Sequence, residues 1–160
     1  MSAQTVPKLT FDGGLLREQN LPPAIRTLKA LEAEGKVEIF ETDRAKETKA
    51  AANAAYNWPG APPRTTKSRS PRRPAAGAIS FQNISAVLFP QRDSHRLNMT
   101  EVNCVAHQLH HHTAGRTIFV TRNTEVFLSG GKRERLAQLK IIVLTPEETV
   151  VALEQSAAQA

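Results

Sequence analysis

Apolar and polar residues in the first 60 positions follow two different spacings. Residues 6–12 (VPKLTFD) and 37–40 (VEIF) are short apolar-rich runs, and runs of this kind are typical of strands. Between them, apolar residues recur at intervals of three and predict a helix that begins near Pro22–Pro23 and ends at Gly35. The order strand, helix, strand favours a parallel α/β sheet.

The pattern then changes in the middle of the chain. Alanine-rich residues 44–56 predict a helix that Thr42 or Asp43 can cap. Residues 58–77 (WPGAPPRTTKSRSPRRPAAG) carry five prolines and five basic residues without apolar periodicity, so we expect a flexible insertion. Residues 79–89 have apolar positions at helical spacing, although a strand remains an alternative there.

The second half of the chain returns to regular spacing. Apolar residues at i, i+3, i+4 and i+7 predict one helix face, formed by Val102, Val105, Ala106 and Leu109. Residues 117–121 predict a strand, 132–139 a short helix and 141–144 a final strand. Pro146 then begins a C-terminal helix. The whole pattern predicts one α/β domain over residues 1–160, with the 58–77 segment inserted in it.

Composition restricts the setting of this domain. A chain with 40% hydrophobic and 22% charged residues has the composition of an ordinary globular protein. Its single cysteine, Cys104, excludes an internal disulfide and suits a reducing compartment. The N-terminus lacks the apolar run of a signal peptide, and the longest aliphatic run is too short to span a bilayer. We therefore expect a soluble cytoplasmic protein without membrane contact.

The net charge of +6 is concentrated in one segment. Residues 48–92 contain seven basic residues and no acidic one, whereas the rest carries 14 basic and 15 acidic residues. Clustering of positive charge favours a polyanionic partner, and RNA is the first candidate. The candidate RNA-binding residues of the insertion are Arg64, Lys67, Arg69, Arg72 and Arg73. The alternative is a solvated basic loop.

Acidic residues stand where strands end and helices begin. Asp12 directly follows the first strand, Glu47 lies one turn into the helix after the second, and Glu101 begins the helix before the third. Asn123 and Glu125 follow the third strand. Because the carboxyl ends of parallel strands share one edge of a sheet, these groups can converge. Crowded carboxylates need a compensating cation, and Mg²⁺ or Mn²⁺ prefers oxygen ligands of this kind.

Structural roles are the alternative for each acidic group. Glu101 can close a capping box with Asn98, in the pattern N-x-x-E. Glu47 can pair with Arg44 on an exposed helix face, and Asp12 can cap its own turn. Spacing alone leaves these alternatives open.

Three segments together resemble the PIN domain, a nuclease family that includes many bacterial toxin ribonucleases. The segments are LTFDGGLL (9–16), VEIFETDRAKE (37–47) and IFVTRNTEVFL (118–128). The resemblance implies a three-layer α/β/α sandwich around a mostly parallel sheet. It also implies a metal-dependent endoribonuclease with Asp12, Glu47, Glu101 and Asn123 as catalytic and metal-binding residues.

The sequence departs from the family pattern at two positions. Glu101 and Asn123 stand where family members usually carry aspartate. Asparagine offers a neutral carbonyl oxygen, so metal affinity should fall, and Glu125 is a further candidate ligand. Thr121, in the Thr-x-Asp position of the family, joins the candidates for nucleic-acid contact. If the protein is a toxin, the expected partners are an antitoxin protein and a second copy of the chain.

The asparagine also supports a second hypothesis, in which a PIN-like domain without activity serves as an RNA-binding or interaction module. Other chemistry has less support. His107 and His111 share the i, i+4 spacing of a zinc chelate, but neither an H-E-x-x-H motif nor a cysteine pair accompanies them. We expect the run His110–His112 to form a solvated face that aids RNA contact. Tyr56 and Trp58 are candidates for base stacking.

Overall fold

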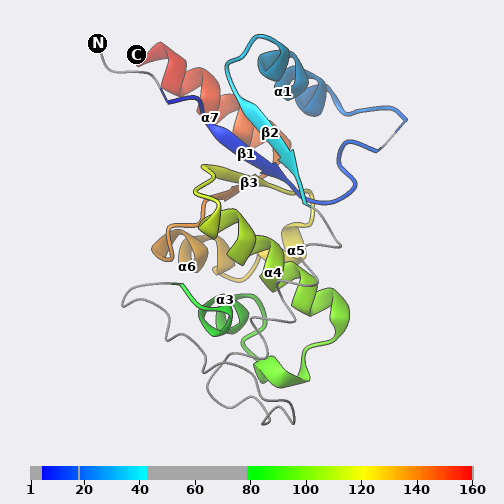
Figure 1. Cartoon of the computed structure of the whole chain (residues 1–160), viewed down its shortest axis with the longest axis vertical. Coiled ribbons are helices and arrows are strands. Elements are labelled where there is room, and N and C mark those ends of the chain that lie inside the picture. Colours follow the sequence, from blue (N-terminus) through cyan, green and yellow to red (C-terminus); the bar gives the residue numbers. More distant parts are fainter. Residues whose placement is uncertain (1–4, 18, 43–78, 160) are drawn as a thin grey trace, which may run out of the picture. The chain divides into compact units, whose positions relative to one another are not determined.

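The predicted strands form one sheet in the computed structural model, which describes residues 5–17, 19–42 and 79–159 (Figure 1). The sheet order is β2-β1-β3-β4. Its strands are β1 (Lys8–Phe11), β2 (Glu38–Glu41), β3 (Ile118–Val120) and β4 (Val143–Leu144). All three neighbouring pairs are parallel, with Leu9 opposite both Ile39 and Ile118, and Phe119 opposite Val143. The α/β fold with a parallel sheet is therefore confirmed, and the sheet is parallel throughout.

Contacts divide the chain into two compact units, one with Met1–Asp43 and His111–Ala160 and the other with Arg44–His110. The first unit contains the sheet and four helices, which are α1 (Pro23–Ala33), α5 (Thr124–Phe127), α6 (Lys132–Gln138) and α7 (Pro146–Ala158). The second contains α3 (Phe81–Leu88), the 3-10 turn η1 (Ser94–Arg96) and most of α4 (Met99–Thr113). The prediction of a single domain stays a prediction.

Both faces of the sheet are buried, as the continuous apolar runs of its strands require. Successive side chains of a strand point to opposite faces. On β3, Ile118 and Val120 join the core that includes Ile25 of α1, and Leu153 of α7 packs against that core. Phe119 points the other way and lies 5.3 Å from the ring of Phe127 in α5. Helices thus flank the sheet on both faces, and α1 packs beside α7 on one of them (Figure 1).

The last strand is shorter than the predicted 141–144 because the hydrogen bonds that close helix α6 extend to Ile141. Lys140 has a positive φ of 63°, its N–H donates to the carbonyl of Ala137, and the N–H of Ile141 donates to that of Leu136. This pair of bonds is the Schellman ending of a helix. Pairing with β3 therefore starts only at Val143.

In the second unit, the structure decides an alternative that periodicity left open. Residues 81–88 form a helix, α3, and Ser80 begins it with a capping box in which Asn83 is the reciprocal partner. A capping box gives two backbone N–H groups local hydrogen-bond partners. In a strand, the same groups would need partners from a neighbouring strand. The predicted helix over 44–56 and the insertion over 58–77 lie outside the described residues. Within the described part, no helix combines the length and apolarity needed to cross a membrane.

Helix α7 begins with a capping box that also ties it to α6. The Thr145 hydroxyl accepts from the Glu148 N–H at 3.2 Å, and Glu148 Oε2 accepts from the Thr145 N–H at 2.9 Å. Arg133 of α6 donates to both carboxylate oxygens of Glu148, at 2.9 and 3.0 Å. Partial burial raises the pKa of Glu148, but the bonds from Thr145 and Arg133 outweigh it and lower the pKa below its ordinary 4.5.

The change Glu148→Gln is expected to reduce stability in full above about pH 4.5, and the loss should shrink as pH falls through the lowered pKa of folded Glu148. Glutamine preserves the capping box, so the change isolates the charge. The loss should be under about 1 kcal/mol, since the ion pair is partly exposed. Urea unfolding at pH 7 and pH 3 measures it, and a difference that persists undiminished at pH 3 would contradict the assignment.

Candidate active site at the carboxyl edge of the sheet

The sheet order creates a crevice between the ends of two strands. From β1 the chain crosses to β2 on one side, and it later returns to β3 on the other side of β1. In open α/β sheets, ligands bind at such a switch point, outside the carboxyl ends of the strands. The residues that follow β1 and β3 here are Asp12 and Thr121–Asn123.

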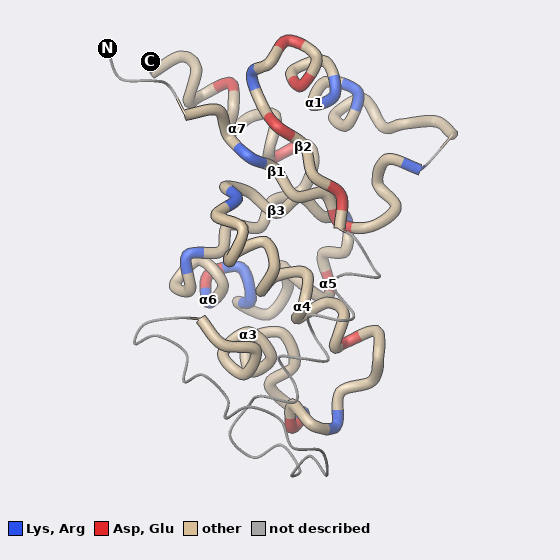
Figure 2. Tube along the Cα trace, in the orientation of Figure 1, with Lys and Arg blue, Asp and Glu red and all other residues tan. Residues whose placement is uncertain are grey.

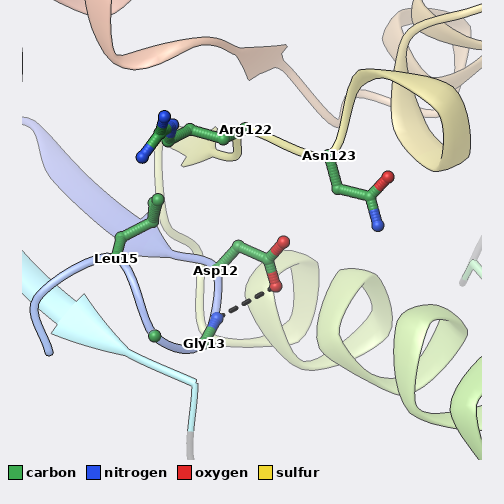
Figure 3. Close-up of a pocket in the computed structure, with 6 residues that line it drawn as sticks. Asp12, Gly13, Leu15, Arg122 and Asn123 are labelled. Carbon is green, nitrogen blue, oxygen red and sulfur yellow. Dashed lines mark hydrogen bonds between the residues drawn. The ribbon is translucent and has the colours of Figure 1, made fainter. Parts of the chain in front are cut away.

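A pocket of about 610 Å³ opens at this switch point (Figure 3). All of its lining residues belong to the first unit. They are Asp12, Gly13, Gly14, Leu15, Arg122 and Asn123. The sequence-based expectation that Asp12 and Asn123 meet at one edge of the sheet is therefore confirmed for these two residues.

Hydrogen bonds hold the Asp12 side chain in place at both carboxylate oxygens. Oδ1 accepts from the N–H of Gly13 at 3.0 Å, and Oδ2 accepts from the hydroxyl of Thr121 at 2.8 Å. The backbone N–H of Asp12 also donates to the carbonyl of Val120 at 2.9 Å. These bonds fix the orientation of the carboxylate at the end of β1.

Thr121 connects the two strand ends. Its side chain is fully buried, and the same hydroxyl that donates to Asp12 accepts from the Asn123 N–H at 3.0 Å. Thr121 was expected to contact nucleic acid. Its side chain is 0% exposed, so its burial lends this role no support, and the role stays a prediction. Thr121 positions the aspartate.

Two glycines keep the first turn of the pocket narrow and open. Gly14 has φ of 95°, a conformation that residues with a Cβ rarely adopt. At Gly13 a Cβ would come within 3.1 Å of the Thr42 hydroxyl oxygen, which is tighter than an ordinary contact. The sequence Asp-Gly-Gly therefore lets the chain turn directly behind the carboxylate.

Asn123 has a structural role in addition to its place at the pocket. Its side-chain oxygen accepts from the Val126 N–H at 3.3 Å, which makes Asn123 the N-cap of α5. That oxygen is the atom expected from the sequence to contact a metal ion. The helix α5 itself was not predicted, although an asparagine after a strand is a typical N-terminal signal. The role of Asn123 as a metal ligand stays a prediction.

Other predicted site residues are not among those lining the pocket. Glu125 is exposed in the first turn of α5. Glu101 belongs to the second unit, where it forms the alternative capping box with Asn98 and lies 3.3 Å from Arg92. Outside the described residues are Glu47, Tyr56, Trp58 and the basic residues Arg64, Lys67, Arg69, Arg72 and Arg73. Their roles stay predictions.

Charge on the described residues lacks the segregation seen in the sequence as a whole. Basic and acidic residues are interspersed on α1 and α6 (Figure 2). Among the described residues, no three His, Cys, Asp or Glu side chains are placed to hold one metal ion. Within the described part, Asp12 is therefore the one carboxylate that lines the pocket.

The expectation of a solvated histidine face is wrong for His111, whereas His110 and His112 are half-buried. Only 7% of His107 and 1% of His111 are exposed. In the first unit, His111 Nδ1 lies 2.7 Å from the Thr10 hydroxyl, and the ring meets Phe119 edge-on at 5.6 Å. Arg116 donates to the same hydroxyl at 3.3 Å. His111 is therefore buried against the sheet through its contacts with Thr10 and Phe119.

Arg122 is a charged pocket residue that was not among the candidates chosen from the sequence. It stands between Thr121 and Asn123 in the chain, is exposed, and lines the pocket. The available signal was its position, since a residue directly after a strand-end threonine faces the same edge.

Fold and pocket together define an α/β protein with an oriented carboxylate at the switch point of a parallel sheet. No protein-family model, curated protein or solved structure matches the chain.

Proposed function

We propose that the protein is a metal-dependent endoribonuclease with a PIN-like arrangement of its site. The observation that supports this best is Asp12, which is held by Thr121 and Gly13 in an open pocket at the switch point. These two hydrogen bonds fix the orientation of the Asp12 carboxylate at the pocket. A cation is the ligand that such a carboxylate attracts.

The chemistry of the site suits Mg²⁺ or Mn²⁺. Mg²⁺ usually keeps several waters and takes one or two carboxylates together with substrate phosphates, so one fixed carboxylate is a sufficient starting point. Asp12 would hold the ion, whereas the roles of Glu47 and Glu101, which belong to the second unit, stay predictions. When bound, the ion would stabilise the charge that develops on a phosphoryl oxygen during hydrolysis.

The protein's own residues prepare the pocket for a phosphodiester. Thr121 holds Asp12 at a single orientation, which lowers the entropic cost of assembling the site. Arg122 places a permanent positive charge at the pocket, and Gly13–Gly14 leave the approach free of side chains. The proposed basic residues of 64–73 would attract the RNA strand by long-range electrostatics.

Removal of metal is expected to abolish cleavage. A single-stranded RNA of mixed sequence should be cut in Mn²⁺ or Mg²⁺, remain intact in EDTA, and be cut again when Mn²⁺ is restored. Gel analysis of end-labelled RNA measures the products. Cleavage that continues in EDTA would contradict a metal-dependent mechanism.

A catalytically inactive RNA-binding module is the second candidate. It is favoured by the neutral Asn123, whose side-chain oxygen already accepts a hydrogen bond from the Val126 N–H. Calorimetric titration with Mn²⁺ separates the two candidates. Heat of binding that Asp12→Asn removes supports the nuclease, whereas RNA binding without any metal binding at millimolar Mn²⁺ supports the module.

A further inference from the structure

The pocket carries hydrogen-bond donors on two sides of its carboxylate. In Figure 3, the Arg122 guanidinium lies above Leu15 and points away from the Asp12 carboxylate, and the side-chain amide of Asn123 lies on the other side of that carboxylate. Both donor residues are exposed, and both line the pocket. Hydrogen-bond donors on two sides of the Asp12 carboxylate suit a ligand that carries more than one anionic group. Such a ligand can approach once a cation screens the charge of the carboxylate.

The capping bond decides which end of the Asn123 amide faces the pocket. The side-chain oxygen of Asn123 accepts a hydrogen bond from the Val126 N–H. If the amide were turned over, its NH₂ group would face that N–H, and two donors cannot form a hydrogen bond. The NH₂ group is therefore the end that remains for a ligand, on the side of Asp12 (Figure 3). Toward a ligand, Asn123 presents N–H groups, which bind anionic oxygens and repel metal ions.

Arg122 complements this donor. Arginine carries its charge at every physiological pH and binds phosphate oxygens through a planar fork of N–H groups. Thr121 fixes the backbone between the two strand ends through the bond from the Asn123 N–H, so both donors start from a rigid segment. Their placement does not depend on a long mobile loop.

We propose that Arg122 and the Asn123 amide bind two neighbouring phosphate groups of a single-stranded RNA, one on each side of Asp12. This proposal rests on the proposed function, because the cation at Asp12 lets phosphates approach the carboxylate. Asn123 thus acts as a substrate-binding residue and not as a metal ligand. A free phosphate or a mononucleotide reaches one donor at a time, whereas a strand reaches both.

Loss of Arg122 is the first test. Binding of a fluorescently labelled 12-nucleotide oligouridylate is followed by anisotropy in Ca²⁺, and again in EDTA, over a series of salt concentrations. Arg122→Ala should lower affinity about fivefold at 0.1 M salt and reduce the slope of log K against log salt by about 0.7, the value for one phosphate contact on a single strand. Arg122→Lys should retain the slope because it retains the charge.

Lys36→Ala is the matched control. Lys36 is exposed and precedes β2, so it lies at the amino edge of the parallel sheet, opposite the pocket. The variant removes the same charge from the same unit and should leave the salt slope unchanged. Equal slopes for wild type, Arg122→Ala and Lys36→Ala would overturn the role of Arg122.

Asn123→Asp is the second test. Aspartate caps a helix as well as asparagine, so α5 should persist, but a carboxylate replaces the N–H donors. We expect RNA affinity in Ca²⁺ to fall about tenfold, as for the loss of a hydrogen bond to a charged group. Unchanged or tighter RNA binding in Ca²⁺, with tighter Mn²⁺ binding, would overturn the proposal and return Asn123 to the metal shell.

Competition identifies the ligand class and separates two kinds of failure. The 5′-phosphorylated uridine dinucleotide, which carries two phosphate groups, should displace the labelled strand at a lower concentration than uridine monophosphate or inorganic phosphate does. Equal potency of the three competitors would overturn the two-phosphate arrangement. Cleavage is measured separately. If the Arg122 and Asn123 substitutions weaken RNA binding but the protein cleaves no RNA, the nuclease is refuted and the RNA-binding pocket is supported. If the protein cleaves RNA but the substitutions leave RNA binding unchanged, only this inference is refuted.

Discussion

Asp12→Asn should lower the rate of RNA cleavage by about 100-fold or more while the protein stays folded. The substitution removes the one carboxylate that lines the pocket among the described residues. An amide oxygen can still accept from the Gly13 N–H, and the Thr121 hydroxyl can turn to accept from the new NH₂ group. Initial rates on single-stranded RNA in Mn²⁺ measure the effect, and thermal melting verifies the fold.

Glu38→Gln provides the matched control for this change. Glu38 is an exposed carboxylate at the start of β2, at the opposite edge of the sheet from the pocket. Its replacement makes the same change of charge and should leave the cleavage rate within about twofold of wild type, as expected for a surface site away from the chemistry. Equal cleavage by wild type and Asp12→Asn would remove Asp12 from the mechanism.

Thr121→Val should reduce both stability and activity. Valine leaves Asp12 Oδ2 and the Asn123 N–H without the partner that the hydroxyl provides to each. Loss of a buried hydroxyl that satisfies two groups costs about 1–3 kcal/mol in the free energy of unfolding. With Asp12 free to rotate, kcat should fall more than KM rises, because a positioning contact acts on the reacting geometry.

Two variants separate positioning from packing. Thr121→Ser restores the hydroxyl and should recover most of the activity. Thr42→Val removes another buried hydroxyl near the turn at Gly13, one without a hydrogen-bond partner in the described structure. It should leave the unfolding free energy unchanged or slightly higher, since no bond is lost. A loss in Thr121→Val no larger than in Thr42→Val would contradict the positioning role.

Much of the fold follows from local pattern. Strands β1, β2 and β3 were predicted within two residues, because each is a short apolar-rich run bounded by glycine, proline or polar residues, and those of β1 and β3 are buried. The capping box of Asn98 and Glu101 was also readable, since its residues are three apart. Short-range hydrogen bonds of this kind are encoded by neighbours in the chain.

The buried histidines show where local pattern is insufficient. A run of three histidines is polar by composition, yet His111 is 1% exposed and its ring meets Phe119 of β3 edge-on. The hydroxyl of Thr10 on β1 offsets the cost of burying the ring, because it forms a hydrogen bond with Nδ1. The partner lies 101 residues away in the chain, so periodicity in the helix cannot reveal it.

The sequence by itself determined the alternation of strands and helices and placed Asp12 at the carboxyl end of the first strand. These features depend on apolar period and turn residues, which act over a few positions. Only the tertiary structure decided that Thr121, 109 residues away, holds Asp12, that Arg122 shares its pocket, and that Asn123 turns its oxygen toward α5. Those relations depend on strand order and side-chain direction, because β3 pairs beside β1 and brings distant residues within hydrogen-bond reach.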